Sequence, residues 1–110
     1  MGLMGHSDGD VALHAIIDAV LGAAALGDIG VHFPSTDPET RDISSLELLH
    51  RTAVLLQSQG WGIINVDVTI VAEYPNLGPY LSTMCQRVAD SLGLTVRQVS
   101  VKATTTDGLG

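Results

Sequence analysis

The sequence has few of the residues on which several classes of protein depend. Its 110 residues contain one cysteine, Cys85, and 4% aromatic residues. A single cysteine excludes an internal disulfide and a zinc cluster built from thiolates. Five Lys and Arg residues against twelve Asp and Glu residues give a formal net charge of -7. A chain this acidic offers no basic stripe to phosphate backbones or anionic lipids, which argues against nucleic-acid and membrane partners.

Long apolar runs and a targeting segment are also missing. Asp or Gly interrupts each apolar stretch well before a membrane-spanning length, and residues 1–7 lack a basic region followed by an apolar one. We therefore expect neither a transmembrane helix nor a signal peptide. With one cysteine, a reducing bacterial cytoplasm is the default, although a plastid protein without its targeting segment would show the same signals.

What the chain does contain favours a single compact domain over residues 1–110. Hydrophobic residues make up 45% of the sequence, mostly Ala, Val, Leu and Ile, which suits close packing of helices on a sheet. The acids are concentrated in residues 1–50, where eight Asp and Glu face one Arg. Phosphate binding in so acidic a half would need metal ions to neutralise charge, which indicates metal-assisted phosphoryl chemistry.

The first half of the chain predicts one long helix followed by a loop. Ser7 and Asp10 have the spacing of a capping box, with Asp in place of the usual Glu or Gln, and predict a helix from about Asp8 to about Ala25. Residues 28–42 carry turn residues with little periodicity. We interpret them as a functional loop and a candidate lid.

The second half predicts two more helices and two strands. Ser44 with Glu47 begins a helix that ends near Gly60, and residues 80–92 place an apolar stripe at helical spacing. Alternating residues over 64–72 and 99–103 predict two strands, the second leading into a turn at Thr104, Thr105 and Thr106. Two short strands are too little sheet for three helices. We expect a domain that is incomplete or completed by another chain.

Three clusters of polar residues are candidates for chemistry. Asp10, His14 and Asp18 share one helix face at i, i+4, i+8 spacing, which suits either a metal-binding imidazole flanked by carboxylates or a histidine that only bonds its neighbours.

The other two clusters have equally open interpretations. His6 and Ser7 lie where free backbone amides favour a phosphate, although Ser7 as a simple cap is the more common role. Residues 104–107 offer three hydroxyls and a carboxylate that suit phosphates and a cation, or form a plain turn.

Four segments together resemble the 2-C-methyl-D-erythritol 2,4-cyclodiphosphate synthase family. They are GHSDGDVALHA at residues 5–15, LGDIGVHFPSTDP at 26–38, NVDVTIVAEYP at 65–75 and VKATTTDGLG at 101–110. The resemblance implies an α+β fold in which helices pack on one face of a mixed sheet. It further implies a homotrimer whose three sheets face inward and whose active sites lie between subunits.

The resemblance also implies a reaction of non-mevalonate isoprenoid biosynthesis. In the family, the 2-phosphate of a cytidine diphosphate-linked methylerythritol attacks the β-phosphorus, and the cyclic diphosphate and CMP are released. Carried over by motif, His6 and Thr105 would support the transition state. His14 would bind zinc, and Asp107 would bind the magnesium or manganese at the diphosphate.

The substrate-binding positions implied by the resemblance form four groups. They are His6 and Ser7 at the phosphate; Asp28, Ile29, Gly30, Phe33, Pro34, Ser35, Thr36 and Asp37 at the methylerythritol; Ala72, Glu73, Tyr74, Pro75, Asn76, Leu77 and Gly78 at the cytidine; and Thr104, Thr105, Thr106 and Asp107 at the phosphates.

The sequence departs from the family pattern at both ends. The family's other two zinc ligands come from an Asp-x-His motif, which does not precede His6 here, and a Gly- and Arg-containing segment does not follow Gly110. We therefore expect a domain incomplete at both ends. Ser35, Asn76 and Asp107 stand where Asp, Lys and Glu are usual. Two alternatives to the synthase are a non-catalytic trimeric remnant that binds cytidine nucleotides and a metal-dependent phosphohydrolase that yields linear phosphates.

Overall fold

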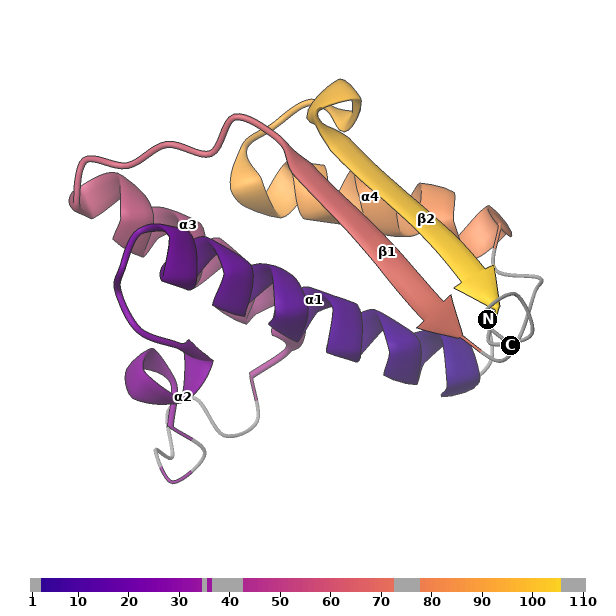
Figure 1. Cartoon of the computed structure of the whole chain (residues 1–110), viewed down its shortest axis with the longest axis horizontal. Helices are drawn as coiled ribbons and strands as arrows, with labels where there is room; N and C mark the ends of the chain where they lie inside the picture. Colours follow the sequence, from indigo (N-terminus) through magenta and orange to yellow (C-terminus); the bar gives the residue numbers. More distant parts are fainter. Residues whose placement is uncertain (1–2, 35, 37–42, 73–77, 106–110) are drawn as a thin grey trace.

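The computed structural model describes residues 3–34, 36, 43–72 and 78–105 (Figure 1). The elements are α1 (Leu3–Ala23), α2 (Ile29–His32), α3 (Ser45–Ser58), β1 (Val66–Ala72), α4 (Gly78–Leu92), the short 3-10 helix η1 (Val96–Gln98) and β2 (Val99–Thr105). The α+β class is confirmed. Because β1 and β2 are parallel, the chain must cross over between them, and α4 makes that crossover.

The two strands pair along their whole length, from Val66 opposite Val99 to Ala72 opposite Thr105. The sheet of the described residues is therefore parallel, and the expected mixed sheet is not found there. Thr104 and Thr105 extend β2, so the predicted turn at these two residues is wrong. The continued ladder with β1 and the high strand propensity of threonine explain the difference.

The helices cover one face of this sheet. Along β1, Val66, Val68 and Ile70 are buried or half-buried, whereas Asp67 and Thr69 are exposed, as expected for side chains that alternate between two faces. Helices α1 and α4 contact the strands, and α3 packs against both helices (Figure 1). The core lies between the helices and the inner face of the sheet.

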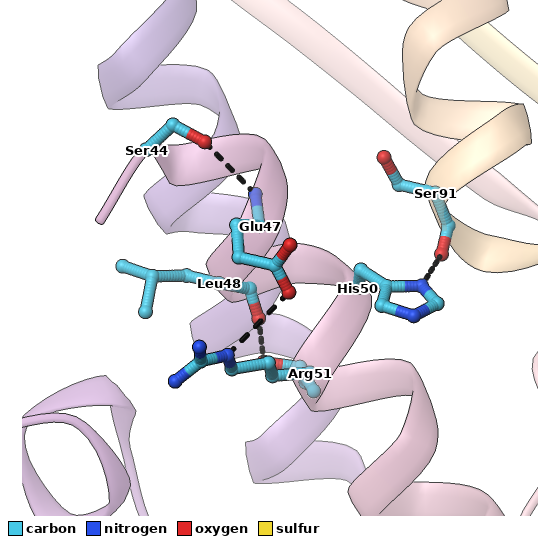
Figure 2. Close-up of polar contacts among 7 residues, drawn as sticks. Ser44, Glu47, Leu48, His50, Arg51 and Ser91 are labelled. Carbon is cyan, nitrogen blue, oxygen red and sulfur yellow. Dashed lines mark hydrogen bonds and ion pairs between the residues drawn. The ribbon is translucent and has the colours of Figure 1, made fainter. Parts of the chain in front are cut away.

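Helix α3 begins as the sequence predicts. The Ser44 hydroxyl oxygen accepts a hydrogen bond from the Glu47 amide at 3.2 Å, which caps the helix (Figure 2). Arg51 Nε reaches the same Glu47 side chain at 3.4 Å. Figure 2 shows His50 pointing across to α4, where its Nδ1 lies 3.3 Å from the Ser91 carbonyl oxygen. These contacts fix the start of α3 and tie the helix to α4.

Helix α1 begins earlier than the sequence predicts. It starts at Leu3 rather than near Asp8, so Ser7 lies within the helix and the predicted capping box is wrong. Once a helix has nucleated, each added residue gains a hydrogen bond, and the good helix formers Leu3 and Met4 extend it. Although α1 has 21 residues, neither it nor any other helix of the described ranges is long and apolar enough to cross a membrane.

Candidate functional site

The histidine predicted as a metal ligand lies on an exposed face of α1. Its Nε2 is 3.2 Å from the hydroxyl oxygen of Ser45, the buried first residue of α3. Of the two flanking carboxylates, Asp18 accepts from the Ile29 amide, and His14 itself contacts a hydroxyl of the neighbouring helix. His14 and Ser45 are 31 positions apart, so their contact depends on the packing of α1 against α3. The contact with Ser45 uses Nε2 of His14, and Nδ1 is the other nitrogen of the ring.

Two carboxylates hold the start of α2. The Ile29 amide donates to Asp18 Oδ1 at 2.7 Å, and the Val31 amide donates to Asp28 Oδ1 at 3.1 Å. Asp28 is the residue directly before α2 and has the extended backbone of an N-cap. A four-residue helix is too short to be stable alone, so side-chain capping of its free amides is important here. The segment that was predicted to be a loop therefore contains one ordered helical turn.

The end of α2 is anchored as well. Nε2 of His32 lies 2.5 Å from the Leu26 carbonyl oxygen, and the Phe33 amide donates to the Ile29 carbonyl at 2.8 Å. Phe33 and Pro34 follow as half-buried residues. The part of the predicted methylerythritol group that is described, Asp28 to Pro34, thus has a fixed backbone on both sides of its helical turn.

A second group of predicted residues gathers at the carboxyl ends of the strands. Ala72 ends β1, Thr104 and Thr105 end β2, and Gly78 begins α4. The beginning of α1 lies close to the beginning of α4, because a side chain at Gly9 would meet the Tyr80 hydroxyl. Figure 1 shows both strand ends at this end of the molecule, with α2 on the other side.

The remaining predicted positions divide between these two places and the undescribed residues. His6 and Ser7 lie in the first turns of α1, so their expected place before the helix is wrong. Thr36 is exposed beyond α2. Ser35, Asp37, Glu73, Tyr74, Pro75, Asn76, Leu77, Thr106 and Asp107 lie outside the described residues.

The described residues supply only part of a metal site. Among them, no three His, Cys, Asp or Glu side chains are grouped to hold an ion. His14 fits one ligand position, since its imidazole is exposed and the Ser45 contact at one of its two ring nitrogens orients the ring. Asp107, the second predicted ligand, is outside the described residues.

A large hollow of the described structure lies elsewhere. A groove of about 670 Å³ runs between α1 and β1 and is lined by apolar side chains such as Ala19, Val66 and Trp61. None of the predicted site residues lines this groove. A phosphate requires charged and hydrogen-bonding groups, and such groups lie around His14 and Asp28.

Two opposite charges on the outer face of the sheet form an ion pair. Lys102 of β2 donates to the Asp67 carboxylate of β1, and this hydrogen bond holds the pKa of Asp67 below its usual range. Both side chains are exposed. The side chain of Lys102 thus lies on the outer face with Asp67, and it is engaged in this ion pair.

Comparison with known proteins gives one consistent result. The chain matches the model of the YgbB family over residues 1–110. A 2-C-methyl-D-erythritol 2,4-cyclodiphosphate synthase of Syntrophomonas wolfei is 60% identical over 109 residues, which are 99% of this chain and 69% of that protein. A protein of the same name from Desulfatibacillum aliphaticivorans is 56% identical over 109 residues, with 99% and 70% covered.

Solved structures agree with the sequence comparison. A 2C-methyl-D-erythritol-2,4-cyclodiphosphate synthase in its CDP-bound form superimposes with a TM-score of 0.82 at 31% identity, covering 89% of this chain and 65% of that chain. The bifunctional IspDF of Campylobacter jejuni gives a TM-score of 0.80 at 39% identity, covering 89% and 27%. The chain thus spans about two thirds of the length of the first of these structures and of the curated relatives.

Proposed function

The chain belongs to the YgbB family, whose curated relatives are named 2-C-methyl-D-erythritol 2,4-cyclodiphosphate synthase, and from this premise we propose that it catalyses the same cyclisation. The substrate is 4-diphosphocytidyl-2-C-methyl-D-erythritol 2-phosphate. The products are 2-C-methyl-D-erythritol 2,4-cyclodiphosphate and CMP, and the setting is isoprenoid precursor synthesis in a bacterial cytoplasm. The observation that carries the proposal is 60% identity over 99% of the chain.

The reaction is an internal phosphoryl transfer. An oxygen of the 2-phosphate forms a bond to the β-phosphorus, and the bond from that phosphorus to the bridging oxygen breaks. The bridging oxygen leaves with its electron pair as part of CMP. Because nucleophile and electrophile belong to one molecule, catalysis consists mainly of folding the substrate into the reactive geometry and offsetting its negative charge.

The two groups of described residues would hold different parts of the substrate. The Asp28, Ile29 and Gly30 segment would hold the methylerythritol portion, supported by the fixed amides of Ile29 and Val31. Thr104 and Thr105, at the end of β2, would contact the phosphates. His6 and Thr105 are the residues that we propose act on the transition state. Ala72 and Gly78 flank the segment that would contact the cytidine.

Divalent cations would supply charge neutralisation at the diphosphate when bound. Within the chain, His14 is the residue suited to hold zinc, because Ser45 fixes its Nε2 and so the orientation of the ring. Asp107 is our candidate for the ligand of magnesium or manganese. The acidic first half of the chain, with eight Asp and Glu residues against one Arg, fits a substrate that arrives with its metal ions.

The separation of the two groups supports active sites shared between subunits of a homotrimer. Helix α1 rises about 1.5 Å per residue, which puts about 18 Å between position 6 and Asp18, where α2 is attached. Figure 1 shows α2 and the carboxyl ends of the strands on different sides of the molecule. A neighbouring subunit would bring the complementary group. The outer face of the sheet, exposed at Asp67, Thr69 and Val71, is our candidate for the trimer's interior.

Phosphorus NMR of the substrate incubated with the full protein, with and without zinc and magnesium, tests this proposal. We expect metal-dependent conversion of the diphosphate signals into those of a cyclic diphosphate, with stoichiometric CMP. Linear phosphates would establish the phosphohydrolase alternative. Unchanged signals in the presence of both metals would refute the synthase and favour a remnant that only binds cytidine nucleotides.

A further inference from the structure

One exposed carboxylate of α1 is bonded to a different helix. Asp18 lies one helical turn beyond His14 and is exposed. Its Oδ1 accepts a hydrogen bond of 2.7 Å from the Ile29 amide, eleven residues further along the chain. This is a contact between two elements, because Asp18 belongs to α1 and Ile29 is the first residue of α2.

The hydrogen bond from Ile29 to Asp18 fixes the start of α2 against α1. An N-cap residue can satisfy only some of the free amides at a helix start. Asp28 takes the Val31 amide, and Asp18 takes the Ile29 amide, so the two carboxylates together bind two of the four amides of α2. Asp28 moves with the segment that it caps, whereas Asp18 is fixed to a long helix whose next turn contains the fully buried Leu21.

We propose that Asp18 is a positioning residue that fixes the Asp28–Gly30 segment in the conformation that receives the substrate. The inference rests on the proposed function, in which this segment holds the methylerythritol portion. Without the Asp18 carboxylate, the segment must be ordered by the substrate itself, and that ordering weakens binding. The segment is equally ordered in the bound substrate complex and in the transition state. Loss of the Asp18 carboxylate therefore raises KM and leaves kcat nearly unchanged.

Asp18→Ala and Asp18→Asn, compared in the full protein, test this role. The amide oxygen of Asn can still accept from Ile29, so Asn is the conservative rescue. Asp90→Ala is the matched control, since Asp90 is an exposed helical acid on α4 that accepts a hydrogen bond from the Gln86 side chain. For Asp18→Ala we expect KM to rise about fivefold with kcat within about twofold, the loss of one exposed charge-assisted hydrogen bond. For Asp18→Asn and Asp90→Ala we expect KM within about twofold of the unsubstituted protein.

Amide hydrogen exchange measured by NMR provides a readout that does not depend on activity. In Asp18→Ala we expect the Ile29 amide to exchange about tenfold faster, while the core amides of Leu49 and Val88 keep their rates. Unchanged exchange at Ile29 would overturn the proposal, as would faster exchange throughout the core, which indicates a general loss of stability. Faster exchange at Ile29 with an unaltered KM would also overturn it. If the unsubstituted protein does not convert the substrate, the proposed function fails, and exchange at Ile29 still decides whether Asp18 holds the segment.

Discussion

Gly9 of α1 lies against Tyr80 of α4. We therefore predict that Gly9→Ala destabilises the unsubstituted protein and stabilises a Tyr80→Ala variant. Gly9 is buried, and a Cβ atom built there would lie 1.7 Å from the Tyr80 hydroxyl oxygen and 3.0 Å from its Cζ. No side chain tolerates an approach of 1.7 Å. An alanine at position 9 therefore has to displace the half-buried Tyr80 ring, which connects the start of α1 to the start of α4.

Two opposing terms determine the size of the effect. Replacing glycine by alanine inside a helix stabilises the helix by about 1 kcal/mol. Displacing the half-buried Tyr80 side chain forfeits part of its packing, which costs about 2 kcal/mol. We expect Gly9→Ala to lower the free energy of unfolding by about 1 kcal/mol. In a Tyr80→Ala background the obstacle is gone, and the same change should stabilise the protein by about 1 kcal/mol.

A double-mutant cycle in urea, at one fixed protomer concentration, measures this coupling of about 2 kcal/mol. Gly22→Ala is the matched control on the same helix, because nothing lies within 4 Å of the added Cβ. Gly22 lies in the last turn, so we expect about 0.5 kcal/mol of stabilisation in both backgrounds. If Gly9→Ala stabilises the two backgrounds equally, Tyr80 does not lie over Gly9 and the argument for this contact fails.

Three further predictions concern the core, a cap and the charged pair. Leu49→Ala, at a fully buried position, should cost about 3 kcal/mol in urea unfolding, against less than about 0.5 kcal/mol for Val54→Ala, which is 53% exposed on the same helix. Ser44→Ala should cost about 1 kcal/mol and lower the thermal midpoint, while an equal midpoint would contradict the cap in Figure 2. Lys102 lowers the pKa of Asp67, so the pair stabilises the fold at neutral pH and loses this contribution as the pH falls below about 4. The urea midpoints of Asp67→Asn and the unsubstituted protein should therefore converge in acid, and a gap that widens there would count against the pair.

The helices and strands whose apolar residues recur at regular spacing were predictable from the sequence. Helices α3 and α4 and both strands occur where apolar spacing places them, since a periodic apolar face must be buried whatever it packs against. The cap at Ser44 followed from the same local pattern. The start of α1 was not predicted, because a capping box is a weak local preference and the good helix formers before Ser7 extended the helix.

Most contacts that build the candidate site could not be predicted from local sequence patterns. The partners Ser45 and His14 are 31 residues apart, and Asp18 and Ile29 are 11 apart. Neither pair leaves a signal at a fixed spacing, because each depends on how one element packs against another. Helix α2 was expected to be a loop for the same reason: its stability comes partly from a carboxylate on α1. The spacing of Asp10, His14 and Asp18 did correctly place the last two on an exposed face of one helix.

The most direct test of a cyclising synthase with shared active sites is to mix two inactive variants. Asp28→Ala removes a residue of the α2 group, and Thr105→Ala removes a residue at the end of β2. The variants are unfolded together, refolded into mixed trimers at equal concentration, and assayed by phosphorus NMR for the cyclic diphosphate. If each site takes one group from each of two neighbouring subunits, roughly a quarter of the sites are intact and roughly a quarter of full activity returns. A mixture as inactive as its components, beside an unsubstituted protein that refolds with full activity, would contradict the shared site.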